Sequence, residues 1–125
     1  MLNFEKLLKS FKNAFRGIYH VFQGEQNFRI HAFLAVLVFI LAFIVKVRIG
    51  EFITLIISIS ILLVLEIINT AMEKVIDVIK PRVHHYAAEI KDVLAGAVLV
   101  GAIQCAIVVL FVFIPYFISR LSNIF

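Results

Sequence analysis

The sequence predicts an all-α integral membrane protein, with an amphipathic N-terminal surface helix followed by three transmembrane helices. Of its 125 residues, 63% are hydrophobic and only 16% are charged, whereas a soluble domain is about 45–50% apolar and about 25% charged. Too few polar side chains remain to cover a water-facing surface, so lipid must surround most of the chain. We expect residues 1–125 to form a single membrane-embedded domain, because the length allows one domain at most.

Residues 3–23 are expected to form the surface helix. Their apolar side chains recur at steps of three and four residues, which is the spacing of one face of a helix. Basic residues occupy the other side, and a basic amphipathic helix with an aromatic apolar face is typical of the membrane interface. The alternative is a helix packed on a soluble core, but there is little soluble sequence to pack against. The apolar positions are Phe4, Leu7, Leu8, Phe11, Phe15, Ile18, Tyr19 and Phe22.

Three apolar runs predict transmembrane helices at about residues 30–47, 52–77 and 88–117, each close to the ~20 residues that a bilayer requires. The polar segment 23–27 should turn the chain before the first span. Pro81 argues against uninterrupted helix between the second and third spans, and Pro115 is expected to kink the third helix or end it early. Small residues in the third helix allow close helix contact and favour an oligomer: Ala95, Gly96, Ala97, Gly101 and Ala102.

The basic residues are distributed unevenly between the two ends of the predicted spans. Nine of the twelve lie before the first span or between the second and third, and the positive-inside rule places that side in the cytoplasm. We therefore expect a multi-pass cell-membrane protein with a cytoplasmic N-terminus. This basic face would attract anionic headgroups or phosphates, and no nucleic acid partner is expected. The nine residues are Lys6, Lys9, Lys12, Arg16, Arg29, Lys74, Lys80, Arg82 and Lys91.

A polar stripe occupies the cytoplasmic end of the second span. Because each helical residue turns about 100°, its members fall within about 60° of Glu66 around the axis. Eleven residues separate Glu66 from Asp77, or about 16 Å, so Glu66 should lie well below the headgroups if Asp77 reaches them. Charge in a bilayer costs roughly 2.5–3.5 kcal/mol per residue, which indicates a function for these carboxylates. The stripe consists of Glu66, Asn69, Thr70, Glu73 and Asp77.

These polar residues suit proton transfer, a divalent cation and phosphate groups. A buried carboxylate such as Glu66 can accept a proton near neutral pH. Glu73, nearer water, suits Mg²⁺, which binds one or two carboxylates together with substrate phosphates, and Glu25 could supply the second carboxylate. Lys91-Asp92 opens the third helix, where a Lys can contact a polyphosphate. The glycine-rich nucleotide loops of soluble folds are absent from the sequence.

Each feature alone also has a purely structural interpretation. Glu66 could be an intramembrane carboxylate bonded to a neighbouring helix, the outer stripe a solvated helix end, and Lys91-Asp92 a helix start. Their joint occurrence on the basic side, at membrane depth, favours a function. The histidines lack the spacing of a zinc site, and two of them, His20 and His31, are assigned to the membrane interface.

The motif Glu66-x-x-Asn69-Thr70-Ala71-x-Glu73-x-x-x-Asp77 resembles that of the prokaryotic diacylglycerol kinases and the related undecaprenol kinases. Two further segments resemble this family: Glu25-x-x-Phe28-Arg29, and Lys91-Asp92 with Ala95-Gly96-Ala97-Val98-Leu99. The resemblance covers nearly the whole chain and is closer to the Gram-positive branch, through Phe15-Arg16-Gly17-Ile18 and the loop around His84. One departure is the segment 84–89, His-His-Tyr-Ala-Ala-Glu, where that branch often has His-Pro-Leu-Ala-Lys.

This resemblance implies a homotrimeric helical bundle in the bacterial cytoplasmic membrane, with active sites that are shared between subunits and face the cytoplasm. It implies transfer of the γ-phosphate of ATP to a lipid hydroxyl, with undecaprenol as the expected acceptor. Glu66 would be the general base, and Glu25 and Glu73 would bind Mg²⁺ and the ATP phosphates. The resemblance also suggests nucleotide contacts from Asn13, His84, Lys91 and Asp92, and substrate or supporting roles for Arg29, Asn69 and Asp77.

Three alternatives remain open from the sequence. The same chemistry with diacylglycerol as the acceptor would produce phosphatidic acid. A small proton- or cation-handling membrane protein could use Glu66 and Glu73 for ions instead of phosphoryl transfer. A non-catalytic assembly subunit would leave the combined polar site unexplained.

Overall fold

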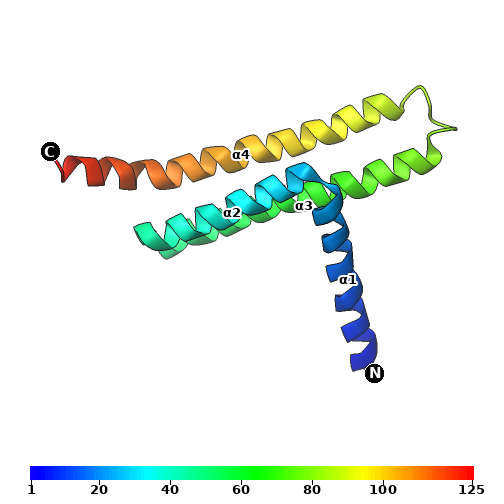
Figure 1. The fold of residues 1–125 in the computed structure, drawn as a ribbon, viewed down its shortest axis with the longest axis horizontal. Coiled ribbons are helices and arrows are strands. Elements are labelled where there is room, and N and C mark those ends of the chain that lie inside the picture. Colours follow the sequence, from blue (N-terminus) through cyan, green and yellow to red (C-terminus); the bar gives the residue numbers. More distant parts are fainter.

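The structure is a computed structural model that describes residues 1–125, and four α-helices make up nearly all of the chain (Figure 1). Three of them are long and apolar enough to cross a membrane. The predicted all-helical membrane protein with three spans is therefore confirmed at this level. In chain order the helices are α1 (Phe4–Gly24), α2 (Gln26–Val45), α3 (Ile49–Ile79) and α4 (Ala87–Ser122).

Most helix ends lie beyond the bounds expected from the apolar runs, although α2 ends at Val45 and not at residue 47. α2 begins at Gln26 instead of about residue 30, and α3 runs from Ile49 to Ile79 instead of about 52–77. The turn expected over residues 23–27 is reduced to Glu25, whose backbone is extended (φ −112°, ψ 115°). The expectation followed apolar side chains, whereas a helix continues into polar flanks as long as its backbone hydrogen bonds are made.

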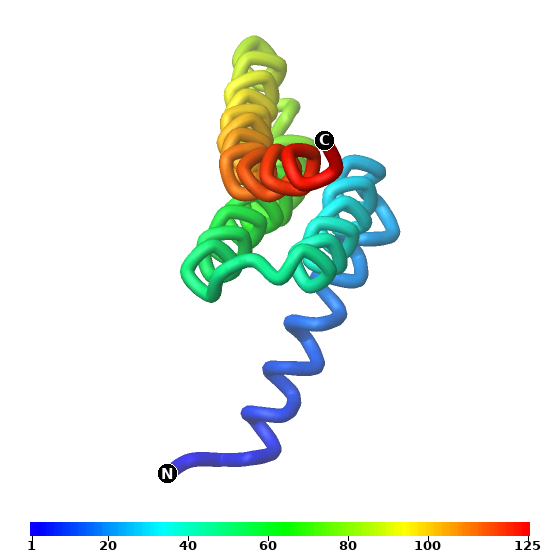
Figure 2. The backbone as a smooth tube through the Cα atoms, turned by 90° about the vertical axis from the view of Figure 1, so that its left-hand side faces the viewer, coloured from blue at the N-terminus to red at the C-terminus, as the bar shows by residue number.

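α2, α3 and α4 lie side by side and enclose a thin core (Figures 1 and 2). One cluster of buried residues is centred on Leu62, and a second, nearer the α2–α3 turn, is centred on Leu55. Only 16 of the 125 residues are buried, so the single chain cannot shield its apolar side chains from water by itself. Lipid or further protein chains must cover the remaining apolar surface.

α3 and α4 approach each other closely at Gly101. A Cβ added there would lie 2.7 Å from Cδ1 of Leu65, so any larger residue would force the Leu65 side chain to move. Nearer the middle of the span, Gln104 Nε2 donates to Ser58 Oγ at 3.0 Å. Close packing of small residues and hydrogen bonds between helices are the interactions that hold helices together in lipid.

α1 leaves the bundle at its junction with α2 and points away across the direction of the other helices (Figure 1). Asn3 caps its N-terminus, because its Oδ1 accepts from the backbone N–H groups of Glu5 and Lys6. Val21 is the only buried residue of α1. The apolar side chains along the rest of the helix are exposed, so α1 has no partner within the chain for most of its length.

The α1–α2 junction lies partway along α3, and the far ends of α3 and α4 extend beyond it (Figure 1). α2 has 20 residues, which matches one bilayer crossing, whereas α3 has 31 and α4 has 36. The excess in α3 amounts to about three helical turns. The end of α3 and the start of α4, with the turn between them, therefore form an extension beyond the level of Glu25.

Pro115 lies inside α4, which continues to Ser122 instead of ending near residue 117. Proline lacks an N–H and its ring clashes with the preceding turn, so it kinks a helix that continues past it. The C-terminal part of the chain accordingly turns away from the axis of the rest of α4 (Figure 2). Of the two outcomes expected for Pro115, the structure has the kink.

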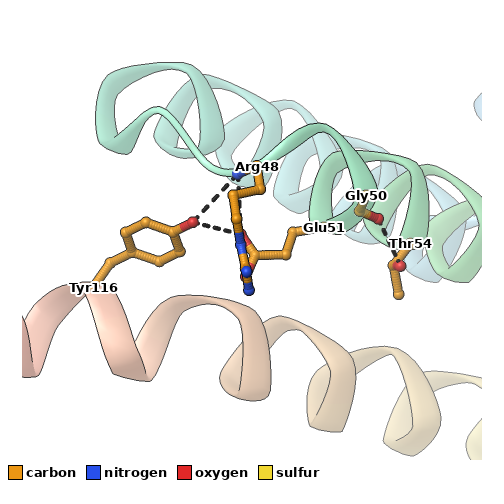
Figure 3. A network of polar contacts seen from close by, with 5 residues as sticks. All are labelled: Arg48, Gly50, Glu51, Thr54 and Tyr116. Carbon is orange, nitrogen blue, oxygen red and sulfur yellow. Dashed lines mark hydrogen bonds and ion pairs between the residues drawn. The ribbon is translucent and has the colours of Figure 1, made fainter.

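A polar clamp of Arg48, Glu51 and Tyr116 ties the α2–α3 turn to α4 (Figure 3). Glu51 accepts from the backbone N–H and the guanidinium of Arg48, at 3.0 and 2.9 Å, and from the Tyr116 hydroxyl at 2.5 Å. The hydrogen bond that its guanidinium donates to Glu51 raises the pKa of Arg48 above its ordinary value. This clamp lies at the opposite end of the bundle from the α3–α4 turn.

Candidate active site

The polar stripe of α3 lines a pocket with residues from two other parts of the chain. Glu66, Asn69, Thr70 and Glu73 contribute one wall of this pocket, whose volume is about 170 Å³. The α1–α2 junction provides another wall, and α4 closes a third. These further lining residues are Glu25, Asn27, Phe28, Ala95 and Val98.

Glu25 reaches the pocket because it is the single non-helical residue between α1 and α2. Its extended backbone serves as the C-cap of α1 and the N-cap of α2. Phe28, one turn further on, is 6% exposed and anchors the start of α2 in the bundle. Three carboxylates therefore line one cavity, that of Glu25 and those of Glu66 and Glu73, which lie some forty residues further along the chain.

Glu66 is buried, with a relative exposure of 4%. Its Oε1 lies 2.6 Å from Nδ1 of His31 on α2. Its Oε2 is also buried and has no hydrogen-bond partner. The Thr70 hydroxyl donates to the backbone carbonyl of Glu66 at 3.0 Å and leaves the carboxylate free. A buried oxygen without a partner is costly, so Oε2 is a natural acceptor for a ligand that enters the pocket.

Asn69 and Glu73 form the second polar group of the pocket. Asn69 Nδ2 donates to Glu73 Oε1 at 3.1 Å, one helical turn away. Asn69 Oδ1 is buried and lacks a partner. The pocket therefore presents two unpaired oxygens, one from Glu66 and one from Asn69, beside the carboxylates of Glu25 and Glu73.

The donor atoms of this pocket are hard oxygens. Oxygen ligands are those that Mg²⁺ prefers, and it usually takes one or two carboxylates together with substrate phosphates and water. No group of three or more His, Cys, Asp or Glu side chains lies close enough to hold a metal ion alone. The arrangement thus fits a cation that brings further oxygen ligands with its substrate.

Several residues selected from the sequence lie outside the pocket lining. Asp77 and Lys91 form an ion pair between α3 and α4, with Nζ and Oδ1 2.6 Å apart. The other residues that do not line the pocket are Asn13 on α1, Arg29 on α2, His84 in the α3–α4 turn and Asp92 on α4.

Arg29 and His84 have other partners within the chain. The Arg29 guanidinium donates to the carbonyl oxygens of Phe22 and Gln23, at 3.3 and 2.7 Å. It thereby satisfies carbonyls at the end of α1 that have no helical donor. The ring of His84 packs edge-on against that of His85, with 5.8 Å between centroids.

The sequence interpretation missed the contact of His31. It assigned this residue to the membrane interface, whereas the structure pairs it with Glu66. A signal was present, because an ionisable residue inside a span almost always has a polar partner. Two such residues on neighbouring antiparallel spans are natural candidates for each other, but their register cannot be read from one sequence.

The fold and this pocket define a class of protein: a multi-pass helical membrane protein with an acidic, oxygen-lined site between its spans. The comparisons with known proteins make that class specific. The family described as Prokaryotic diacylglycerol kinase matches residues 12–113. The chain belongs to this family, and it is therefore a membrane-bound lipid kinase that phosphorylates a lipid alcohol.

Individual relatives carry two different names. An undecaprenol kinase of Bacillus subtilis is 38% identical over 110 residues, which cover 88% of this chain and 89% of that protein. A diacylglycerol kinase of Synechocystis is 38% identical over 103 residues, which cover 82% of this chain and 59% of that protein. A diacylglycerol kinase of Haemophilus influenzae is 30% identical over 95 residues, covering 76% and 80% respectively. ATP is the phosphate donor that the kinase family implies.

Proposed function

We propose that the chain transfers the γ-phosphate of ATP to the hydroxyl of undecaprenol and thereby produces undecaprenyl phosphate, with Mg²⁺ as cofactor. The observation that carries this proposal is the buried, unpaired Oε2 of Glu66 in an acidic pocket with Glu25 and Glu73. The choice of undecaprenol is supported by the named relative that matches 89% of its own length.

Glu66 is the proposed general base. Its free Oε2 accepts the hydroxyl proton as the lipid oxygen forms a bond to the γ-phosphorus. The bond between that phosphorus and the bridging oxygen breaks, and ADP leaves with the bonding electrons. Such transfers depend mainly on positioning and charge neutralisation, so a buried base beside a polyphosphate site is sufficient protein machinery.

Glu25 and Glu73 are the proposed Mg²⁺ ligands and would hold the cation beside the ATP phosphates. Bound Mg²⁺ neutralises negative charge on the phosphates. Asn69 is well suited to orient the acceptor, because its Oδ1 is unpaired and its amide already holds Glu73. The two carboxylates lie on different elements, so the cation would also tie the α1–α2 junction to α3.

The nucleotide is proposed to extend from the pocket toward the α3–α4 end. Lys91, Asp92 and His84 would contact it there, and Asn13, on α1, is a further proposed nucleotide ligand. Lys91 is paired with Asp77, which supports a role for Asp77 in holding the lysine near the phosphates. Arg29 is proposed to act indirectly on the substrate, by fixing the end of α1 next to Glu25.

α1 is proposed to lie in the membrane interface on the cytoplasmic side, with residues 1–125 forming one domain. Its exposed apolar side chains support this placement, as does its direction across the bundle (Figure 1). Glu25 would then mark the interface, and Glu66, whose partner His31 lies six residues further along α2, would lie about 9 Å deeper. The far ends of α3 and α4 would project into the cytoplasm, and the basic residues there support that orientation.

A homotrimer is proposed as the functional form, with active sites shared between subunits. The thin core and the unpartnered apolar helix faces support assembly. Native mass spectrometry in mild detergent should give three times the mass of the chain. A monomer that retains full activity would remove the shared-site proposal.

Diacylglycerol is the competing acceptor, because two relatives carry the name diacylglycerol kinase. A side-by-side assay with both lipids in mixed micelles tests the choice. We expect higher kcat/KM with undecaprenol, and a preference for diacylglycerol would overturn the substrate proposal. Ion flux in liposomes without lipid phosphorylation would instead favour the proton- or cation-handling alternative.

A further inference from the structure

His31 contacts the carboxylate of Glu66, and the proposed reaction leaves this contact without a role. Nδ1 of His31 lies 2.6 Å from Oε1 of Glu66. No other side chain forms a hydrogen bond with that carboxylate. The contact with His31 therefore determines which of the two Glu66 oxygens is left without a hydrogen-bond partner.

The surroundings of Glu66 make a donor necessary. The carboxylate is buried, and the other ionisable groups of its pocket, Glu25 and Glu73, are also acidic. A buried charge is strongly unfavourable unless it is paired and hydrogen-bonded. Two basic residues have other partners. Arg29 donates to carbonyl oxygens at the end of α1, and Lys91 forms an ion pair with Asp77. The His31 imidazole is the one side chain of the protein that forms a hydrogen bond with the Glu66 carboxylate.

His31 also separates two cavities of different character. On one side of the pair is the acidic pocket, which Glu66 lines. On the other side is an apolar cavity of about 320 Å³ between α2, α3 and α4, in which His31 is the only lining residue that is not hydrophobic. Rotation of the Glu66 carboxylate toward the apolar side would remove it from the phosphates, so the bond to His31 fixes the oxygen that faces the polar pocket.

We propose that His31 is the positioning residue of Glu66: it donates from Nδ1 to Oε1, holds the carboxylate charge and leaves Oε2 directed at the acceptor hydroxyl. The proposal rests on the proposed function of Glu66. Because Nδ1 donates, the neutral ring carries its proton on Nδ1. His31 itself does not touch the reacting atoms.

Paired substitutions at His31 test this role. His31→Leu removes the donor and keeps the cavity wall apolar, and we expect kcat to fall about 10- to 100-fold through misplacement of the base. The KM values for ATP and lipid should stay within about twofold, because positioning of the base affects the transition state and not ground-state binding. His31→Asn places an amide donor close to the position of Nδ1 and should retain most of kcat.

A matched control is His20→Leu, which removes an exposed histidine of α1 that makes no recorded side-chain contact. Its kcat should equal that of the wild type. If His31→Leu behaves like this control, or if His31→Asn is as slow as His31→Leu while both remain folded, the positioning role is overturned. Glu66→Gln serves as the parallel test of the base, because activity in that variant overturns the proposed function itself.

A spectroscopic measurement is independent of activity. In protein labelled with ¹⁵N-histidine, the His31 resonance should report a protonated Nδ1, and this signal should change in Glu66→Gln and not in Glu73→Gln. A proton on Nε2 alone, or no response to Glu66→Gln, would contradict the proposed bond even in a fully active enzyme.

Discussion

At the residue scale, the carboxylates of the pocket differ in their partners. Glu66 is bonded to a histidine and has one oxygen free, whereas Glu73 is bonded to the amide of Asn69 and shares its cavity with Glu25. The first arrangement suits a base, because one oxygen is held by His31 and the other is buried without a hydrogen-bond partner and can accept a proton. The second suits a cation, because two carboxylates from different elements face the same space.

Glu73→Ala should therefore weaken the binding of Mg²⁺-ATP and leave proton transfer to Glu66 intact. We expect the Mg²⁺ concentration for half-maximal activity to rise about tenfold or more, because one of two protein ligands is lost. A titration of activity against Mg²⁺ at saturating lipid measures this. Glu5→Ala, at the far end of α1, is the control and should match the wild type; unchanged Mg²⁺ dependence in Glu73→Ala would contradict the metal role.

Lys91 forms an ion pair with Asp77 and is also proposed to contact the ATP phosphates. Two substitutions separate the contributions of these two contacts. Asp77→Asn removes the ion pair, and Lys91→Met removes the pair together with the phosphate contact. An exposed ion pair contributes little, so Asp77→Asn should change the KM for ATP only slightly. Lys91→Met should raise that KM about tenfold or more, since hydrogen bonds to charged groups are the stronger ones. Equal effects of the two substitutions on ATP saturation would leave Lys91 a structural residue.

At the element scale, two kinds of contact hold α3 against α4. The close approach at Gly101 acts near Glu66, since its neighbour Leu65 directly precedes that residue. The clamp of Arg48, Glu51 and Tyr116 acts at the opposite end of the helices (Figure 3). Catalytic geometry should therefore be sensitive to the first contact and insensitive to the second.

Tyr116→Phe tests this separation. The substitution removes the hydroxyl that bonds Glu51 and the backbone N–H of Arg48, and it should lower the free energy of unfolding by about 1 kcal/mol. Thermal unfolding in detergent measures the stability, and lipid phosphorylation at low temperature measures the activity. The kcat should be unchanged, and a large loss of kcat in a folded Tyr116→Phe protein would show that the clamp and the pocket are coupled.

The element scale also shows what the sequence could predict. The spacing of Glu66, Asn69 and Glu73 was sufficient to place them on one face of a helix, because helix geometry is local. The pairing of His31 with Glu66 depends on the register between α2 and α3, which is a tertiary property. Arg29 looked available for a substrate, but the carbonyls that it binds become available only because α1 ends next to it.

At the scale of the whole molecule, the unequal lengths of the helices change the depth expected for the site. From one span alone, Asp77 was placed at the headgroups and Glu66 about 16 Å deeper. The structure reduces this depth, because Glu66 contacts His31, which lies six residues after Glu25 and therefore about 9 Å along α2 from the α1–α2 junction. The end of α3 extends beyond that junction (Figure 1). A hydropathy pattern shows where a helix is apolar but not where the neighbouring helix begins. The depth of Glu66 relative to the start of α2 therefore had to come from the structure.

The placement of α1 in the interface can be tested with fluorescence, since the chain contains no tryptophan. Phe11→Trp puts a single fluorophore on the apolar face of α1, and Lys9→Trp puts one on the basic face. In liposomes with brominated acyl chains, the first should be strongly quenched and blue-shifted, and the second should not. Equal quenching at the two positions would contradict a helix that lies in the interface with one face toward lipid.

Glu66 is proposed to remove the acceptor proton in an ATP-dependent lipid kinase. The most direct test is transfer of radiolabel from γ-labelled ATP to undecaprenol by the wild type and by Glu66→Gln, with ATP binding measured in parallel. The substitution keeps the size of the side chain and removes the basic oxygen, so transfer should fall by about 10²–10⁴-fold while ATP binding is retained. Transfer at the wild-type rate by Glu66→Gln, or no labelled lipid from the wild type, would contradict the account.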